Sequence, residues 1–454
     1  MNVVLINPAT EEVLRECAVL DAASVEQRLQ RAERAFVVWR QTDLPSRLEA
    51  VSRFEAALRA SRTELAEAIT REMGKVLKES LGEVDKCLAS CHQLRENFPI
   101  WLAERQYALP SGHSVHLRPL GLILGIMPWN FPLWQVARFA LPALLCGNTV
   151  LLKHAPNTWG VAEMIERLFN AAFPEGAYIN LAIEVPWVER LIADPRVRGV
   201  SLTGSRQAGV SVARLAGQNL KKCVLELGGA DAYVVLDDAD MDLAADVCAR
   251  SRLQNAGQTC IAAKRFIVTA KNAKAFTESL RARLAAMKVG DPADPSSQLG
   301  PLARRDLRDG LAKQVEQSMA QGSRREILAQ GPSARGYYYP ITLLTGVRPG
   351  QVAFDEELFG PVAAVIEAAD EGQALALANQ SRYGLGGALF SRDVEWARRL
   401  AIDEFESGMV WINDFVRAEV TVPFGGVKDS GLGRELGREG CFEITNVKTV
   451  FAKG

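Results

Sequence analysis

Three polar side chains in this sequence are of the types that attack and activate a carbonyl group. Cys260 ends the stretch NAGQTC, Glu226 begins ELGG upstream of it, and Asn130 ends PWN earlier still. A thiolate is a good carbonyl nucleophile, a carboxylate can act as a general base, and an amide can donate a hydrogen bond to an oxyanion. Each short motif is uninformative by itself, but together and in this order they predict thiol-based chemistry on an aldehyde.

Separate roles follow from the three residue types. We expect Cys260 to be the nucleophile, with Asn130 and the Cys260 backbone N–H as oxyanion donors that typically lower a barrier by ~3–4 kcal/mol. Glu226 would activate the water that hydrolyses a thioester. The structural alternatives are a cysteine that only packs in its loop, an asparagine that caps the helix beginning near Phe131 and a surface glutamate at a strand end. For Asn130 the two roles are compatible.

A nucleotide site is indicated more weakly. The segment TGSRQAG, residues 203–209, joins a predicted strand to a predicted helix, where glycines and helix N–H groups suit a pyrophosphate. It lacks the full G-x-G-x-x-G spacing. Lys153, at another strand end, could contact a ribose or a phosphate, or could be a solvated lysine.

Composition bounds the class of protein. A chain of 454 residues with 48% hydrophobic and 24% charged residues is expected to be globular with two or three domains. Its 53 basic and 54 acidic residues argue against general binding to nucleic acid or to a membrane surface. The N-terminus does not resemble a signal peptide, and no apolar run approaches the ~20 residues that cross a bilayer.

The eight cysteines are scattered, which is typical of free thiols in a reducing cytoplasm. Only Cys87 and Cys91, followed by His92, form a cluster. It falls in a predicted helix and is interpreted as packing, and no metal site is expected. The seven cysteines other than Cys260 are all interpreted in this way.

The order of predicted elements indicates an α/β fold. Residues 24–105 show helical spacing of apolar residues, and from residue 121 short apolar strands alternate with helices. This pattern predicts a parallel, doubly wound sheet, which binds ligands at the carboxyl ends of its strands. Asn130, Lys153, Gly204 and Glu226 all fall at such ends.

A second alternation of strands and helices begins near residue 230. We therefore predict a cofactor-type domain of residues 1–105 and 121–228 and a second α/β domain of residues 229–428. Residues 106–120 are rich in turn and strand formers. The tail near 443–451 is predicted to be a strand, and no segment adjacent to it in sequence is expected to pair with it. An unpaired strand of this kind commonly finds a partner chain.

The chain resembles the aldehyde dehydrogenase superfamily over essentially its full length. The blocks that carry the resemblance occur in order and are, by first residue, Asn7-Pro-Ala-Thr, Pro128-Trp-Asn-Phe-Pro, Thr203-Gly-Ser, Glu226-Leu-Gly-Gly, Gly257-Gln-Thr-Cys, Glu357-Leu-Phe-Gly-Pro and Pro423-Phe-Gly-Gly-Val-Lys. The resemblance implies an NAD or NADP cofactor, a catalytic domain, and a small β element of residues 106–120 and 442–454 that mediates assembly into a homodimer or homotetramer. It also implies that Cys260, Glu226 and Asn130 take the roles given above.

The same resemblance assigns cofactor contacts, with Glu357 on the nicotinamide ribose. The residues concerned are Trp129, Lys153, Pro156, Gly204, Ser205, Glu357 and Phe359. Many relatives carry a glutamate where this chain has Pro156, and that glutamate binds the adenosine ribose. Its absence removes a repulsion against a 2′-phosphate, so NADP should be tolerated, without being shown to be preferred.

Within the superfamily the chain is most similar to the short bacterial succinate-semialdehyde dehydrogenases. This implies a substrate pocket with Trp134, Arg138 and Arg417, in which the Arg138 guanidinium would hold the distal carboxylate; a surface ion pair is the alternative for Arg138. The subgroup's substrate-binding serine is replaced here by Ala418. Either Arg417 compensates, or the substrate differs.

Three other functions compete with oxidation of a carboxylated aldehyde. A broad-specificity or aromatic aldehyde dehydrogenase would not need the pocket arginine. A reductase that passes the acyl group to coenzyme A would not need Glu226 as a hydrolytic base. A non-enzymatic protein on the same fold would be indifferent to loss of the Cys260 thiol.

Overall fold

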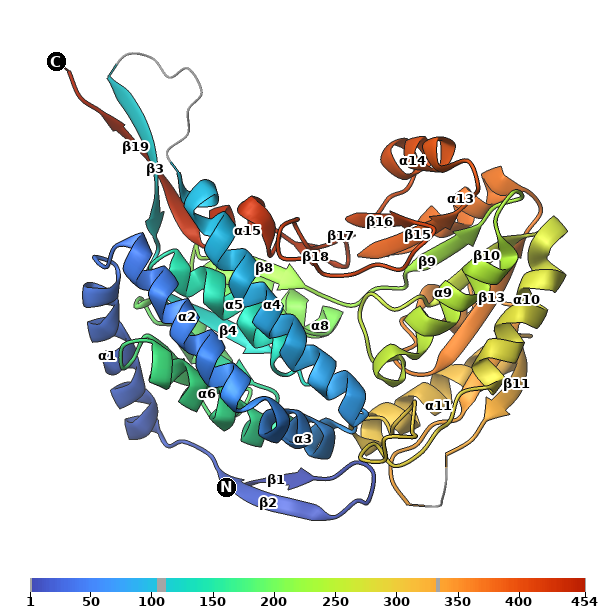
Figure 1. Ribbon diagram of the computed structural model, residues 1–454, viewed down its shortest axis with the longest axis horizontal. Coiled ribbons are helices and arrows are strands. Elements are labelled where there is room, and N and C mark those ends of the chain that lie inside the picture. The colour runs from blue at the N-terminus through green and yellow to red at the C-terminus, as the bar shows by residue number, and fades with distance from the viewer. Residues whose placement is uncertain (1, 104–111, 332–334, 454) are drawn as a thin grey trace.

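The computed structural model describes residues 2–103, 112–331 and 335–453. Two sheets of mainly parallel strands, each with its own helices, form two bodies, and a two-stranded ribbon projects away from them (Figure 1). The predicted α/β class with a parallel sheet is confirmed. In the described part of the chain no helix is long and apolar enough to span a membrane.

The first sheet has six strands, and its inner strands are buried on both faces, as parallel strands between helices require. Only the last short strand, from the C-terminal part of the chain, runs antiparallel to its neighbour. In spatial order the strands are β18 (Gly431–Leu432), β8 (Lys222–Glu226), β7 (Val197–Thr203), β4 (Leu122–Met127), β5 (Thr149–His154) and β6 (Tyr178–Asn180).

Helices of the N-terminal half surround this sheet. They are α1 (Ala22–Trp39), α2 (Leu44–Ala60), α3 (Arg62–Met73), α4 (Leu77–Leu102), α5 (Trp134–Leu145), η1 (Pro156–Thr158), α6 (Trp159–Ala172), α7 (Trp187–Ala193) and α8 (Arg206–Gln218). All twelve residues of α5 are buried, because α4 covers the face of α5 that the sheet leaves free (Figure 1).

The second sheet has seven strands. In spatial order these are β11 (Arg324–Ala329), β12 (Ile341–Thr345), β13 (Val362–Ala368), β10 (Arg265–Thr269), β9 (Ala232–Val235), β15 (Gly386–Phe390) and β16 (Met409–Ile412). The helical segments of this half are α9 (Met241–Leu253), η2 (Gln254–Gly257), α10 (Ala270–Ala285), α11 (Arg305–Ala320), α12 (Val352–Asp355), α13 (Glu371–Asn379) and α14 (Val394–Asp403).

Three small pairs of strands complete the fold. A hairpin of β1 (Asn2–Ile6) and β2 (Val13–Ala18) lies at the N-terminus, and β14 (Tyr383–Gly384) pairs with β17 (Val427–Lys428). After α15 (Gly437–Glu443), strand β19 (Thr445–Phe451) pairs along its whole length with β3 (His113–Pro119). The tail strand therefore has a partner within its own chain. Residues 106–111 of the predicted assembly element lie outside the described residues.

The predicted domain limits stay a prediction, but the positions of the two sheets bear on them. The first sheet's long strands all precede residue 228 and the second sheet's strands all follow it. β18 is the exception, since it returns from residues 431–432 to the edge of β8. This return brings the C-terminal segment against the carboxyl end of β8, where Glu226 lies.

Strand register places the predicted polar residues at one edge of the first sheet. Thr203 on β7 is paired with Glu226 on β8, and Ile126 on β4 is paired with Lys153 on β5. Asn130 follows β4 by three residues. As expected for parallel strands, the carboxyl ends meet at the same edge.

A buried ion pair fixes the start of α5 at that edge. The Lys75 ammonium lies 2.5 Å from Glu83 on α4, and both side chains are excluded from solvent. The other oxygen of Glu83 accepts hydrogen bonds of 2.9 Å from the backbone N–H groups of Leu133 and Trp134. A carboxylate at a helix N-terminus satisfies amides that have no partner within the helix. Glu83 thereby orients the helix that carries two of the predicted site residues.

Replacing Glu83 by alanine should destabilise the protein by about 3–5 kcal/mol, because Lys75 would remain buried without a counter-charge. Urea unfolding followed by tryptophan fluorescence measures the loss. Glu96→Ala is the matched control, since Glu96 lies exposed on the same helix and, among the described residues, pairs with His92 alone. If Glu83→Ala unfolds at the same urea concentration as Glu96→Ala, the ion pair does not anchor α5.

Candidate active site

Cys260 lies where two cavities meet. A larger cavity of about 880 Å³ is lined by residues of α4 and α5 and by segments 295–298 and 415–419. A smaller one of about 390 Å³ is lined by Asn130, Glu226 and the loop that follows β7. Cys260 and Gln135 belong to the walls of both. A thiol placed in this way can be reached by one ligand from each side.

The loop that carries Cys260 has an unusual backbone. Asn255 and Ala256 have φ values of 54° and 53°, in the left-handed region, and Gly257 follows with φ 74°. A Cβ on Gly257 would lie 2.3 Å from the carbonyl oxygen of Gly360, so only glycine fits there. The Asn255 amide donates to the backbone oxygens of Asn130 and Gln258, at 2.8 and 3.2 Å. Such strain is kept where the surroundings impose it, and it is common at active sites.

Asn130 is held rigidly beside this loop. Its side chain is buried, its oxygen accepts from Gln135 Nε2 at 2.9 Å, and its nitrogen donates to the Gln258 carbonyl at 3.0 Å. The amide nitrogen carries a second hydrogen, for which the described residues provide no acceptor. Asn130 does not cap α5, because Leu133 holds the cap position and Glu83 accepts the first helical amides. The remaining hydrogen is therefore available to a ligand.

Burial disfavours the thiolate form of Cys260 in the free protein. Burial raises the pKa of Cys260 to about 11, which outweighs the opposing effect of the positive charges of Lys264 and Arg138. Lys264 Nζ donates hydrogen bonds to the backbone carbonyl oxygens of Thr259 and Cys260, at 3.1 and 2.5 Å. The nucleophile must therefore lose its proton during the reaction.

Glu226 is buried at the end of β8, and neither of its carboxyl oxygens has a hydrogen-bond partner among the described residues. Burial and the nearby charge of Glu435 raise the pKa of Glu226 well above its ordinary value, against the attraction of Arg138. A Cβ on Gly425 would lie 2.7 Å from a Glu226 oxygen, so the returning C-terminal segment leaves no room for another side chain. A carboxylate whose pKa is raised is a stronger base than an ordinary one.

The smaller cavity brings together most of the predicted cofactor residues. Trp129, Gly204, Ser205, Glu357 and Phe359 line it with Cys260 and Glu226. The rings of Trp129 and Phe359 meet edge to face at 5.9 Å, and Ser205 caps α8 by accepting from Ala208 N–H. Glu357 accepts from the Gly229 N–H at 3.2 Å and pairs with Lys264 at 3.2 Å.

Lys153 and Pro156 lie outside this lining, on β5 and at the start of η1. Lys153 is buried, and burial lowers its pKa. No carboxylate, hydroxyl or carbonyl within the described chain accepts a hydrogen bond from its ammonium. A buried cation without a partner, at the same sheet edge as a capped helix N-terminus, fits an anionic nucleotide.

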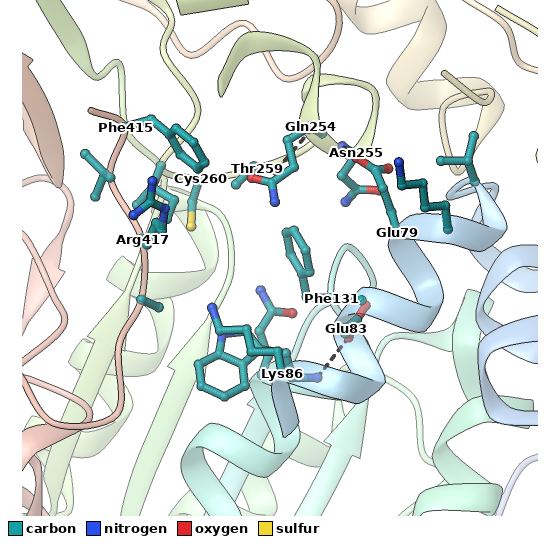
Figure 2. Close-up of a pocket in the computed structure, with 18 of the residues that line it drawn as sticks. Glu79, Glu83, Lys86, Phe131, Gln254, Asn255, Thr259, Cys260, Phe415 and Arg417 are labelled. Atoms are coloured by element: carbon teal, nitrogen blue, oxygen red, sulfur yellow. Dashed lines mark hydrogen bonds between the residues drawn. The ribbon is translucent and has the colours of Figure 1, made fainter. Parts of the chain in front are cut away.

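The three predicted substrate residues, Trp134, Arg138 and Arg417, line the larger cavity. Arg417 is labelled in Figure 2. Arg138 is already engaged: it forms an ion pair with Glu435 and donates to Thr203 Oγ1 at 3.2 Å. Arg417 pairs with Asp414 at 2.5 Å. Their predicted contact with a substrate carboxylate stays a prediction.

Several residues of the site were not predicted from the sequence. Gln135, Asn255 and Gln258 orient Asn130, and Glu435 faces both Arg138 and Glu226. A role for Lys264 in the site could have been suspected from its position, because it is a charged residue only four positions after Cys260. No sequence feature indicated that Glu435 lies in the site, since 209 residues separate it from Glu226.

Comparison with known proteins establishes the class to which this fold and site belong. The sequence profile of the aldehyde dehydrogenase family matches residues 2–450, and the chain belongs to that family. The predicted resemblance and the predicted enzyme class, a dehydrogenase of aldehydes, are confirmed.

Individual relatives are more specific. A succinate semialdehyde dehydrogenase [NAD(P)+] of Escherichia coli K12 is 45% identical over 99% of this chain and 98% of its own length. A succinate-semialdehyde dehydrogenase [NADP(+)] of Deinococcus radiodurans is 46% identical over 98% and 94% of the two chains. The crystal structure of succinic semialdehyde dehydrogenase from Streptococcus pyogenes in complex with NADP+ is 36% identical, covers 100% of both chains and superposes with a TM-score of 0.95.

The raised pKa of Cys260 predicts how fast the thiol is alkylated. Without ligands, the rate constant for iodoacetamide at Cys260 should rise about tenfold per pH unit from pH 7 to pH 10, because only the thiolate reacts. Mass spectrometry of the peptide that contains Cys260 isolates this site, and Cys223, the other half-buried thiol, is an internal control. A rate that levels off below pH 8 would show that the free enzyme already holds a thiolate.

Proposed function

We propose that this protein oxidises succinate semialdehyde to succinate with NADP or NAD. The observation that carries the proposal is the position of Cys260 between a cavity lined by four cationic side chains and a cavity lined by the predicted cofactor residues. The names of the Escherichia coli and Deinococcus radiodurans relatives support the substrate and the cofactors.

The first chemical step is addition of the Cys260 sulfur to the aldehyde carbon. The spare hydrogen of the Asn130 amide and the Cys260 backbone N–H stabilise the negative oxygen that forms. Burial disfavours the thiolate until substrate is bound, and the thiol proton leaves to water in the cavity as the sulfur attacks, so that Glu226 takes no part in this step. When bound, the nicotinamide of the cofactor would supply the acceptor for the hydride that leaves the carbon attached to Cys260.

The second step is hydrolysis of the thioester on Cys260. Glu226 removes a proton from water, the water oxygen attacks the acyl carbon, and the carbon–sulfur bond breaks to give the acid and the free thiol. The absence of hydrogen bonds to Glu226 in the described structure suits this step, because both carboxyl oxygens remain available to water. Glu226 thus favours hydrolysis over transfer of the acyl group to coenzyme A.

The cofactor would lie along the edge of the first sheet. Trp129, Gly204, Ser205, Glu357 and Phe359 would contact it, and Lys153 would reach its adenosine ribose or phosphate. Pro156 places no carboxylate beside that ribose, so a 2′-phosphate is accommodated as well as a hydroxyl.

Assembly and location belong to the same proposal. Val447, Val450 and Phe451 of β19 are exposed, and the β3–β19 ribbon projects from the body of the molecule (Figure 1). Such a ribbon is typical of a strand that pairs with a second copy, and we infer a homodimer or homotetramer. Eight free cysteines favour a reducing cytoplasm.

An aldehyde screen tests the substrate. Reduction of NADP and NAD should be fastest, by kcat/KM, with succinate semialdehyde, and at least about tenfold slower with butanal or benzaldehyde, because only the first carries a carboxylate for the cationic cavity. Equal or higher kcat/KM values for the uncharged aldehydes would favour a broad-specificity or aromatic aldehyde dehydrogenase.

Substitution of Glu226 tests the mechanism. Glu226→Gln keeps the shape of the side chain but removes the base, so steady-state turnover should fall by about 10²–10⁴-fold. One equivalent of reduced cofactor per active site should still form in a rapid burst, and coenzyme A should not accelerate the later phase. Unchanged steady-state turnover would exclude Glu226 as the hydrolytic base; Cys260→Ala, which should show neither burst nor turnover, is the control.

A further inference from the structure

Four cationic side chains line the larger cavity, and they differ in whether they already have a partner. They are Lys78, Lys86, Arg138 and Arg417. Arg138 is engaged by Glu435 and Arg417 by Asp414. An arginine whose carboxylate partner is fixed in the protein must exchange it, or share it, to bind another carboxylate. The remaining candidates are the two lysines of α4.

The two lysines differ in exposure. Lys78 is exposed at the start of α4, whereas Lys86 lies half-buried more than two turns further along the helix. Figure 2 shows Lys86 and Cys260 on opposite walls of the same pocket. A ligand whose aldehyde carbon is at Cys260 can therefore extend across the pocket toward Lys86.

The Lys86 ammonium has no anionic partner among the described residues. It lies over the Trp134 ring, 4.2 Å from the ring centre, and no hydrogen bond or ion pair to it occurs in the part of the chain that the structure describes. Burial, followed by the charge of Arg138, lowers the pKa of Lys86 to about 8. A desolvated cation that rests only on an aromatic ring gains strongly from a carboxylate.

The carboxylates of the cavity cannot supply that partner. One carboxylate oxygen of Glu83 pairs with Lys75, and the other accepts hydrogen bonds from two backbone amides. Glu79 accepts from the Asn255 backbone N–H, and burial raises the pKa of Glu79. Glu419 is exposed at the rim. The negative charge that Lys86 lacks must come from a ligand.

We propose that the Lys86 ammonium, held across the Trp134 ring, is the primary contact for the distal carboxylate of the substrate. Arg138, fixed by Glu435, adds positive charge behind it and remains linked to Thr203. This assignment also removes the difficulty posed by Ala418, since the carboxylate no longer depends on a serine at that position. The inference rests on the proposed function, because it requires a carboxylated aldehyde.

Substitution at Lys86 tests the proposal with two substrates of equal chain length. For Lys86→Met, kcat/KM for succinate semialdehyde should fall by about 30-fold or more, mainly through KM, because one member of a buried charge pair is lost. For butanal, which has no carboxylate, kcat/KM should stay within about threefold of wild type. Retained butanal activity also shows that the variant is folded.

Two further variants sharpen the result. Lys86→Arg keeps the charge and should recover most of the activity with succinate semialdehyde. Lys78→Met removes the exposed lysine at the start of the same helix and should lower kcat/KM for succinate semialdehyde far less than Lys86→Met does. An equal loss on both substrates in Lys86→Met, or no loss on either, would overturn the proposal. If instead wild-type protein itself does not prefer succinate semialdehyde over butanal, the proposed function fails. That result would be distinct from a failure of the Lys86 assignment.

Binding of succinate provides a second readout that does not depend on turnover. Succinate should slow alkylation of Cys260 by iodoacetamide, and the dissociation constant obtained at each pH should rise as the pH passes through about 8, where Lys86 loses its proton. The charged or titratable groups that act on Lys86 are Glu83, Cys87, Arg138 and Cys260. Lys86→Arg, which does not titrate in this range, should bind succinate equally at pH 7 and pH 9.5. A pH dependence that persists in Lys86→Arg would contradict the assignment.

Discussion

Removal of water from a few ionisable groups is the physical constraint on which this site depends. Cys260, Glu226 and Lys86 all lie where burial disfavours their charged forms, and the pKa of each is shifted accordingly. None of the three is neutralised by a fixed ion pair in the described structure. A substrate with a carboxylate and a carbonyl group therefore provides a counter-charge for Lys86 and a carbon for Cys260 to attack.

The scaffold holds these groups in place through fixed contacts among the residues around them. Lys75, Glu83 and the first amides of α5 form one connected set of contacts, and Asn130, Gln135 and Gln258 form another. These contacts fix α5 and the loop before Cys260, so the reactive groups cannot relax toward partners of their own. Rigid support of a few unsatisfied groups is what a preorganised site requires.

How much of this could be predicted from the sequence depends on the range of each interaction. The strands and helices around Asn130, Lys153 and Glu226 were predictable, because apolar runs and helical spacing are local patterns and parallel strands bring their carboxyl ends together. Pairing of β19 with β3 was not predictable from local pattern, since more than 300 residues lie between them. The engagement of Arg138 by Glu435 and the lack of a partner for Lys86 were equally hidden, because only the folded chain shows which charges meet.

The central claim is that substrate becomes covalently attached to the sulfur of Cys260, and mass spectrometry of the trapped acyl-enzyme tests it most directly. Glu226→Gln, mixed with succinate semialdehyde and NADP and quenched in acid, should carry a succinyl group that adds about 100 Da to the peptide containing Cys260. The same treatment without cofactor should leave that peptide unmodified. An acyl group on another cysteine, or none at all while reduced cofactor is formed, would contradict the account.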